Sequence, residues 1–178
     1  MNMLTTLTYL SAIGGVVALI YAVILAVRIN KMDSGTKKMK EIAQSINEGA
    51  KAFLFSEYKI LVIFVATVFV VISVCGIITK SDVLNYRTAL AFLIGAILST
   101  LAGYCGMSVA TKANVRTANA AKEKGMNSAL STAFSGGAVM GMCVSGLGLL
   151  GVCLIYALTG DDNILFGFSL GASSIALF

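Results

Sequence analysis

The sequence contains no histidine and no proline, and only 12% of its 178 residues are charged. Histidine is the commonest metal ligand and the side chain best suited to relay protons near neutral pH, so zinc chemistry is not expected. A soluble globular domain carries roughly 25% charged residues. With 58% hydrophobic residues and a mean hydropathy of +0.92, this chain has too little polar surface for a soluble fold.

The four cysteines all lie inside apolar runs, and no two of them form a C-x-x-C pair. They are Cys75, Cys105, Cys143 and Cys153. A free cysteine in apolar surroundings behaves as a small hydrophobic residue. We therefore predict that all four are buried packing residues, with neither a redox function nor a disulfide framework.

Long apolar runs decide the fold class, because a helix that crosses a bilayer needs about 20 apolar residues. The runs cover residues 4–27, 60–79, 88–111, 129–158 and 164–178. They predict an all-α, polytopic transmembrane helical bundle with four complete spans and the start of a fifth. Residues 1–178 are then expected to be the amino-terminal transmembrane segment of a larger single membrane domain.

Two of the runs have alternative interpretations. The first could be a cleaved signal peptide, but the residues before and at its start, 1–8, carry no basic side chain. The last has only 15 residues, so it could be a re-entrant or interfacial terminus instead of an incomplete span. We favour the membrane-spanning interpretation for both.

Two polar segments, residues 28–59 and 112–127, hold eleven of the thirteen basic residues. Because basic loops stay in the cytoplasm, we predict that both segments are cytoplasmic and that the amino terminus lies outside. The links around Lys80 and Asp161 should also lie outside. These basic segments could attract an anionic substrate or acidic lipid headgroups, but topology alone explains them and is the interpretation we favour.

Both polar segments also have helical character. From Met39 onward, apolar residues recur at helical spacing, which predicts an amphipathic helix that runs directly into the second span. The alanines of residues 112–127 indicate at least partial helix there.

Small residues stand four apart in the third and fourth runs. The two sets are Ala91, Gly95, Ser99 and Gly103, and Ala133, Gly137, Gly141 and Ser145, and the fourth run also carries Gly136, Gly146, Gly148 and Gly151. Such stripes let a neighbouring helix approach closely. They predict tightly packed helices inside a bundle.

No catalytic, cofactor-binding or metal-binding residue can be assigned from the residues alone. All eight acidic residues lie in the polar segments or at their margins, and a charge at membrane depth is the usual mark of a pump or an intramembrane site. The phosphate-binding pattern G-x-x-x-x-G-K-[ST] is absent. We therefore expect that these residues do not form a self-contained pump, and we expect no nucleic-acid partner.

Four sequence strings carry a resemblance to a known family. They are EIAQSINEGAKAFL at 41–54 with EYK at 57–59; GM at 106–107 with ATKANVRT at 110–117 and AA at 120–121; AFSGGAVMG at 133–141 with GLGLLG at 146–151; and GFSLGASSIALF at 167–178. In this order they resemble the membrane-integral, ion-pumping inorganic pyrophosphatases, from the segment that enters the second helix to the start of the fifth.

The resemblance implies a many-helix homodimeric enzyme of the prokaryotic plasma membrane. It implies hydrolysis of pyrophosphate at the cytoplasmic side with Mg²⁺ and transport of protons, sodium ions or both out of the cytoplasm, and it leaves K⁺ open as a second cation. The partners it implies are pyrophosphate, the lipid bilayer, a second copy and the remaining helices of the same protein.

That family builds its hydrolytic site from Asp-rich motifs and lysines on later helices. The resemblance therefore implies that residues 1–178 are scaffold and not catalytic alone, and it determines neither the pumped ion nor the dimer interface. Ser173 and Ser174 could pack near the core of the protein, but we favour serines bonded to their own helix backbone. The alternative function is a non-enzymatic membrane transporter or assembly subunit that packs through its Gly, Ala and Ser helix faces.

Overall fold

The computed structural model describes residues 3–79 and 85–175, and within these ranges the regular structure consists of five helices. They are α1 (Met3–Lys31), α2 (Lys37–Thr79), α3 (Tyr86–Lys124), α4 (Met126–Thr159) and α5 (Asp162–Ile175). The first four are long and apolar enough to cross a membrane. The predicted all-α class with four spans and a shorter fifth helix is confirmed.

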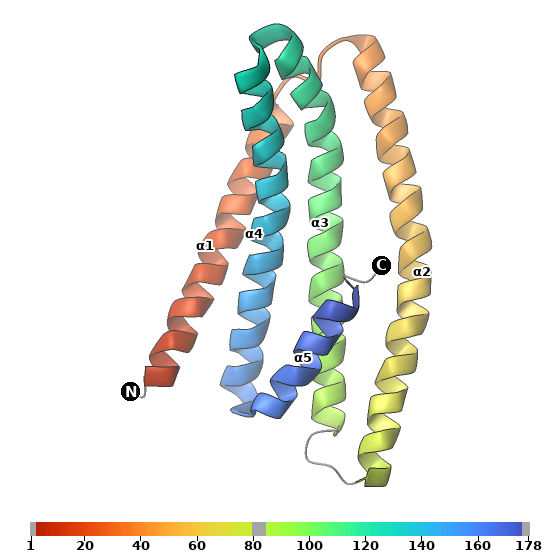
Figure 1. Cartoon of the computed structure of the whole chain (residues 1–178), viewed down its shortest axis with the longest axis vertical. Helices are drawn as coiled ribbons and strands as arrows, with labels where there is room; N and C mark the ends of the chain where they lie inside the picture. The colour runs from red at the N-terminus through yellow and green to blue at the C-terminus, as the bar shows by residue number, and fades with distance from the viewer. Residues whose placement is uncertain (1–2, 80–84, 176–178) are drawn as a thin grey trace.

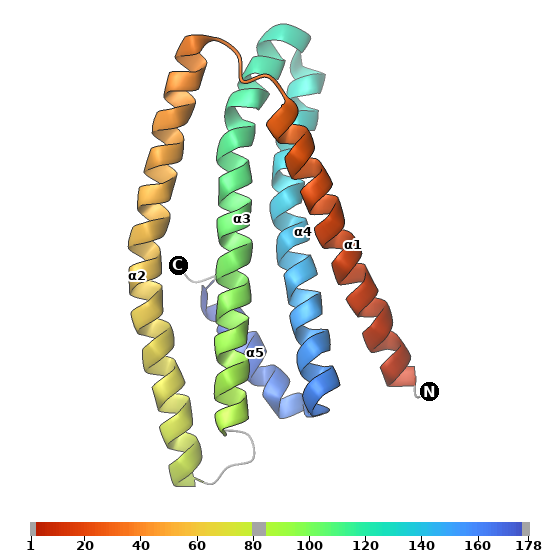
Figure 2. The same cartoon turned by 180° about the vertical axis from the view of Figure 1, so that it is seen from behind.

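The four long helices stand side by side in the order α1, α4, α3, α2 (Figure 1). The short α5 crosses obliquely over the lower halves of α3 and α4, on the side that faces away from the viewer in Figure 2. Helix α3 contacts each of the other four helices. It is therefore the central element on which the rest of the bundle is assembled.

Helices α2 and α3 are longer than the apolar runs that they contain. Helix α2 runs for 43 residues without a break from the polar segment into the second run, as the amphipathic pattern predicts. Helix α3 continues through the second polar segment and ends where Gly125 adopts a φ of 83°. The helical character predicted for residues 112–127 is thus confirmed, and Gly125 makes the turn into α4.

Local chemistry explains where the other helix ends fall. Asn85 caps α3, because its Oδ1 accepts the backbone N–H of Arg87 at 2.9 Å and of Thr88 at 3.0 Å. Gly160 ends α4 in a left-handed conformation, and its N–H donates to the carbonyl oxygen of Tyr156 at 2.8 Å.

Helices α1 and α4 meet through a pair of glycines. A Cβ placed on Gly15 would lie 3.0 Å from the carbonyl oxygen of Gly146, and a Cβ on Gly146 would lie 3.0 Å from the carbonyl oxygen of Gly15. Lipid tails are as apolar as leucine, so helices in a bilayer associate by such close packing. The glycines let the two main chains come close enough for it.

The cysteine prediction is partly wrong. Cys143 and Cys153 are buried and Cys75 is half-buried, but Cys105 is exposed. Cys105 lies beside the exposed Leu101 and Tyr104 on a part of the α3 surface that the described helices leave open. An apolar sequence context identifies a membrane helix but does not say which of its faces is covered.

Candidate functional site

The small-residue stripe of α3 is the contact surface for α5. A Cβ on Gly95 would meet the carbonyl oxygen of Phe168, and a Cβ on Gly171 would meet that of Phe92. Ser99 Oγ donates a hydrogen bond to the carbonyl oxygen of Ala172 at 3.1 Å. Ala91 is buried in one cluster with Phe168 of α5, so close packing is confirmed for Ala91, Gly95 and Ser99. A Cβ on Gly103, the fourth member of the stripe, would meet nothing within 4 Å.

The predicted stripe of α4 does not make the contacts. Its members Ala133, Gly137, Gly141 and Ser145 are all exposed. The packing glycines of α4 lie on a different face: Gly136 against Ala113, Gly146 against α1 and Gly151 against the ring of Phe168. Helix α4 carries small residues on more than one face, and spacing alone cannot tell which face meets α1 and α3.

The main polar cluster lies at one end of the bundle, where the segment between α1 and α2 folds over α3. Arg116 Nε donates to the carbonyl oxygen of Met32 at 3.1 Å, and Arg116 Nη2 donates to that of Asn30 at 3.3 Å. These carbonyls belong to the end of α1, where the helix itself leaves carbonyl groups unpaired. A cation at a helix C-terminus is also favoured by the helix dipole.

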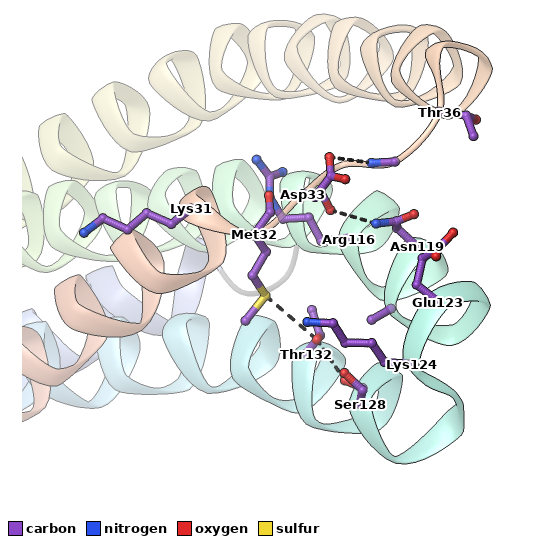
Figure 3. Close-up of a pocket in the computed structure, with 12 residues that line it drawn as sticks. Lys31, Met32, Asp33, Thr36, Arg116, Asn119, Glu123, Lys124, Ser128 and Thr132 are labelled. Atoms are coloured by element: carbon purple, nitrogen blue, oxygen red, sulfur yellow. Dashed lines mark hydrogen bonds between the residues drawn. The ribbon is translucent and has the colours of Figure 1, made fainter.

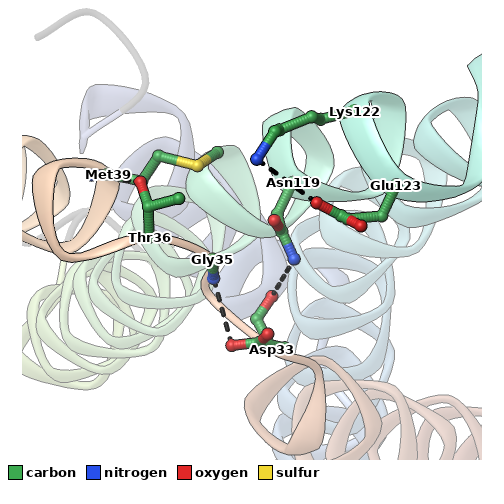
Figure 4. A network of polar contacts seen from close by, with 7 residues as sticks. All are labelled: Asp33, Gly35, Thr36, Met39, Asn119, Lys122 and Glu123. Atoms are coloured by element: carbon green, nitrogen blue, oxygen red, sulfur yellow. Dashed lines mark hydrogen bonds and ion pairs between the residues drawn. The ribbon is translucent and has the colours of Figure 1, made fainter.

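A second contact, three residues further along α3, holds the same segment (Figure 4). Asn119 Nδ2 donates to the carbonyl oxygen of Asp33 at 3.3 Å, and Asp33 Oδ1 accepts the backbone N–H of Gly35 at 3.1 Å. Gly35 has a φ of 81°, and a Cβ there would lie 2.6 Å from Asn119 Oδ1. We call these contacts of Arg116 and Asn119 the α1–α3 clasp.

A polar pocket of about 760 Å³ opens next to the clasp (Figure 3). Its charged lining residues are Lys31, Asp33, Arg116, Glu123 and Lys124. The two predicted polar segments, far apart in the sequence, therefore meet in one place. The sequence indicated neither the clasp nor the pocket. The partners of Arg116 and Asn119 are main-chain atoms, and because every residue has these atoms, no pattern of residue types predicts the contacts.

One acidic residue lies deeper beside α3 than its place in the sequence suggests. Glu57, at the end of the first polar segment, lines a groove of about 310 Å³ together with Gly103 and Met107 of the third apolar run. On the next residue, Tyr58 Oη donates to the carbonyl oxygen of Thr100 at 3.2 Å. The amphipathic part of α2 therefore packs alongside the apolar part of α3.

Residues 3–79 and 85–175 contain no group of three or more His, Cys, Asp or Glu side chains that could hold a metal ion. Ser174 Oγ donates to the carbonyl oxygen of Leu170 at 2.7 Å, which confirms the backbone-bonded interpretation for this serine. Ser173 is exposed and faces a groove between α3, α4 and α5. These residues position helices, and the described structure assigns none of them a chemical step.

Comparison with known proteins gives a consistent result. Residues 16–178 match the family model described as inorganic H⁺ pyrophosphatase. The chain is 48% identical over 169 residues, 94% of its length, to a putative K⁺-stimulated pyrophosphate-energized sodium pump of Clostridium tetani, of which it covers 24%. It is 44% identical over 172 residues, 97% of its length, to a K⁺-insensitive pyrophosphate-energized proton pump of Methanosarcina mazei, of which it covers 25%.

A third relative is a K⁺-stimulated pyrophosphate-energized sodium pump of Thermotoga maritima, with 36% identity over 185 residues, 91% of this chain and 24% of the relative. The chain thus spans about a quarter of the length of the curated relatives that it matches. Because the family model covers nearly all of the sequence, the chain belongs to the inorganic H⁺ pyrophosphatase family.

Proposed function

We propose that this chain is the scaffold portion of a membrane pump that hydrolyses pyrophosphate to phosphate and moves protons, sodium ions or both out of the cytoplasm. The observation that carries the proposal is the family match over residues 16–178. Four long apolar helices support it, and three of them, α1, α3 and α4, pack through glycines, since such a bundle suits a membrane-embedded framework.

The chemistry of this pump lies outside the described residues. Family resemblance implies Mg²⁺, which takes oxygen ligands and would neutralise pyrophosphate, and some relatives are named as K⁺-stimulated. Residues 3–79 and 85–175 hold no group of side chains that fits a metal ion, so no step through Mg²⁺ is assigned to them.

The activity test uses the intact protein that carries this chain, purified into liposomes. We expect Mg²⁺-dependent release of phosphate from pyrophosphate, measured with and without K⁺ and Na⁺, together with ion movement into the lumen. Absence of pyrophosphate hydrolysis under every cation condition would overturn the proposal. It would favour the alternative of a non-enzymatic transporter or assembly subunit.

Membrane orientation is part of the proposal. Basic residues favour a cytoplasmic location for segments 28–59 and 112–127, which places the amino terminus outside. The test uses Ala121→Cys and Asn163→Cys in a cysteine-free background, because both positions are exposed. On intact cells an impermeant maleimide should label the cysteine at position 163. It should label the cysteine at position 121 only after the cells are permeabilised. The reverse labelling pattern would show that the orientation is opposite to the one proposed.

A homodimer is likewise a proposal and concerns the whole protein. Cross-linking of the intact protein in membranes, followed by mass measurement of the solubilised complex, tests it. A single band and mass at the monomer value would contradict it.

A further inference from the structure

The polar pocket beside the α1–α3 clasp lies where the C-terminus of α1, the C-terminus of α3 and the N-terminus of α4 meet (Figure 3). We propose that this pocket binds the phosphate group of an anionic phospholipid. Three cationic side chains line it, Lys31, Arg116 and Lys124. Basic pockets between membrane helices bind acidic lipid headgroups in other membrane proteins.

Two carboxylates, Asp33 and Glu123, also line the pocket, so its three cationic side chains leave it with a net positive charge. Glu123 forms an ion pair with Lys122 at 3.3 Å, and Lys122 does not line the pocket. Asp33 Oδ1 accepts the N–H of Gly35. Among the described residues no carboxylate oxygen is recorded within ion-pair distance of Lys31, Arg116 or Lys124. An anion in the pocket would supply the missing negative charge.

The start of α4 adds a second positive element. Its N-cap is Gly125, which offers no side-chain cap, and its first turn has no acidic residue. Ser128, in that first turn, and Thr132, one turn further along the same helix, line the pocket together with Lys124. The free N–H groups at a helix start favour phosphate, and a hydroxyl and an amine beside them strengthen that preference.

The position of the pocket relative to the membrane favours a lipid over free phosphate as its ligand. Lys31 lies just past the first apolar run, and Ser128 lies just before the fourth, so the pocket is at headgroup level. Below Lys31 the same face of α1 continues with Val27, Ile24 and Ile20, which are 46%, 50% and 56% exposed. That strip gives the acyl chains of a lipid an apolar surface, which a free phosphate does not need.

The test uses the intact protein in nanodiscs of phosphatidylcholine with increasing phosphatidylglycerol, and native mass spectrometry counts the phosphatidylglycerol that stays bound. Lys124→Gln and Lys31→Gln should each weaken retention by about fivefold, since one basic residue near an anionic surface contributes about that factor. Lys112→Gln is the matched control, because Lys112 is an exposed lysine of the same helix that lies outside the pocket and is not paired with any of its carboxylates. It should retain phosphatidylglycerol like the unmodified protein.

Two outcomes would overturn the proposal. One is equal retention in the Lys124→Gln and Lys112→Gln proteins, which would mean that Lys124 interacts only with the C-terminus of α3 and not with a lipid. The other is saturable binding of inorganic phosphate in pure phosphatidylcholine nanodiscs that Lys124→Gln abolishes and that phosphatidylglycerol, added in mixed nanodiscs, does not weaken; this would assign the pocket to a soluble anion. Thermal melting in pure phosphatidylcholine checks that each variant is folded, and pyrophosphate hydrolysis is not used as the readout.

Discussion

Arg116 Nε on α3 lies 3.1 Å from the carbonyl oxygen of Met32, just past the end of α1. Through this contact and the one to Asn30, a single side chain joins the first helix to the centre of the bundle. Charge-assisted hydrogen bonds to carbonyl groups that would otherwise lack partners contribute more than neutral ones. The clasp therefore fixes where α1 ends relative to α3.

Arg116→Gln is predicted to destabilise the protein, because the carbonyl groups of Met32 and Asn30 lose a charged donor. The expected loss is about 2 kcal/mol. It can be measured as a lower apparent melting temperature of the intact protein in detergent. Lys112→Gln, one turn earlier on an exposed side chain, is the control and should change little. Equal melting temperatures for the two variants would contradict the role of the clasp.

Gly171→Ala should weaken the contact between α3 and α5, because the added Cβ meets the main chain of Phe92, which cannot move aside as a side chain could. Overpacking of this kind costs about 1–3 kcal/mol. Gly141→Ala makes the same change inside a helix where a Cβ would meet nothing within 4 Å. The two melting temperatures, compared directly, isolate the packing effect; a Gly171→Ala protein as stable as the Gly141→Ala protein would refute it.

Asparagine should be tolerated at one of the two turns around α4 and destabilising at the other. Gly160 has φ 60° and ψ 14°, a left-handed conformation that asparagine tolerates. Gly125 has φ 83° and ψ −179°, a region that is essentially restricted to glycine. We expect Gly160→Asn to be nearly neutral and Gly125→Asn to cost about 1–3 kcal/mol. Thermal unfolding of both proteins checks this, and a more stable Gly125→Asn variant would show that the turn is misassigned.

The N-cap of α3 provides a fourth test. Asn85→Ala removes the oxygen that accepts the backbone N–H groups of Arg87 and Thr88, so stability should fall by about 1 kcal/mol. Asn85→Asp keeps an acceptor at the same place and should restore most of the loss. If the alanine and aspartate variants have the same melting temperature, below that of the unmodified protein, loss of the cap does not explain the lower stability.

The sequence predicts the spans well because bilayer thickness imposes a length on apolar runs, and those runs lie in helices α1 to α4. It also identifies Gly95 and Ser99 as contact residues, since α3 offers small side chains there on a single face. The faces of α4 could not be distinguished in this way. Gly136 and Gly137 are adjacent in sequence, yet only the first is covered.

The clasp and the polar pocket were beyond sequence reasoning for a different reason. Arg116 and Asn119 read as ordinary polar residues of a basic loop, and their partners are carbonyl oxygens of Met32 and Asp33. Every residue type has a carbonyl group, so the amino-acid sequence does not indicate which carbonyl groups Arg116 and Asn119 will contact. It follows only from the fold, which brings residues more than eighty positions apart together.

The glycines between α3 and α5 also limit how these helices can move. Gly167 faces Thr88 and Gly171 faces Phe92. A slide of α5 by one turn, about 5.4 Å, would bring Ile175 against Phe92 in one direction, or Asn163 against Thr88 in the other. Either large side chain would stand where the two main chains now touch. Helix α5 therefore cannot slide one turn along α3 unless the two helices first move apart.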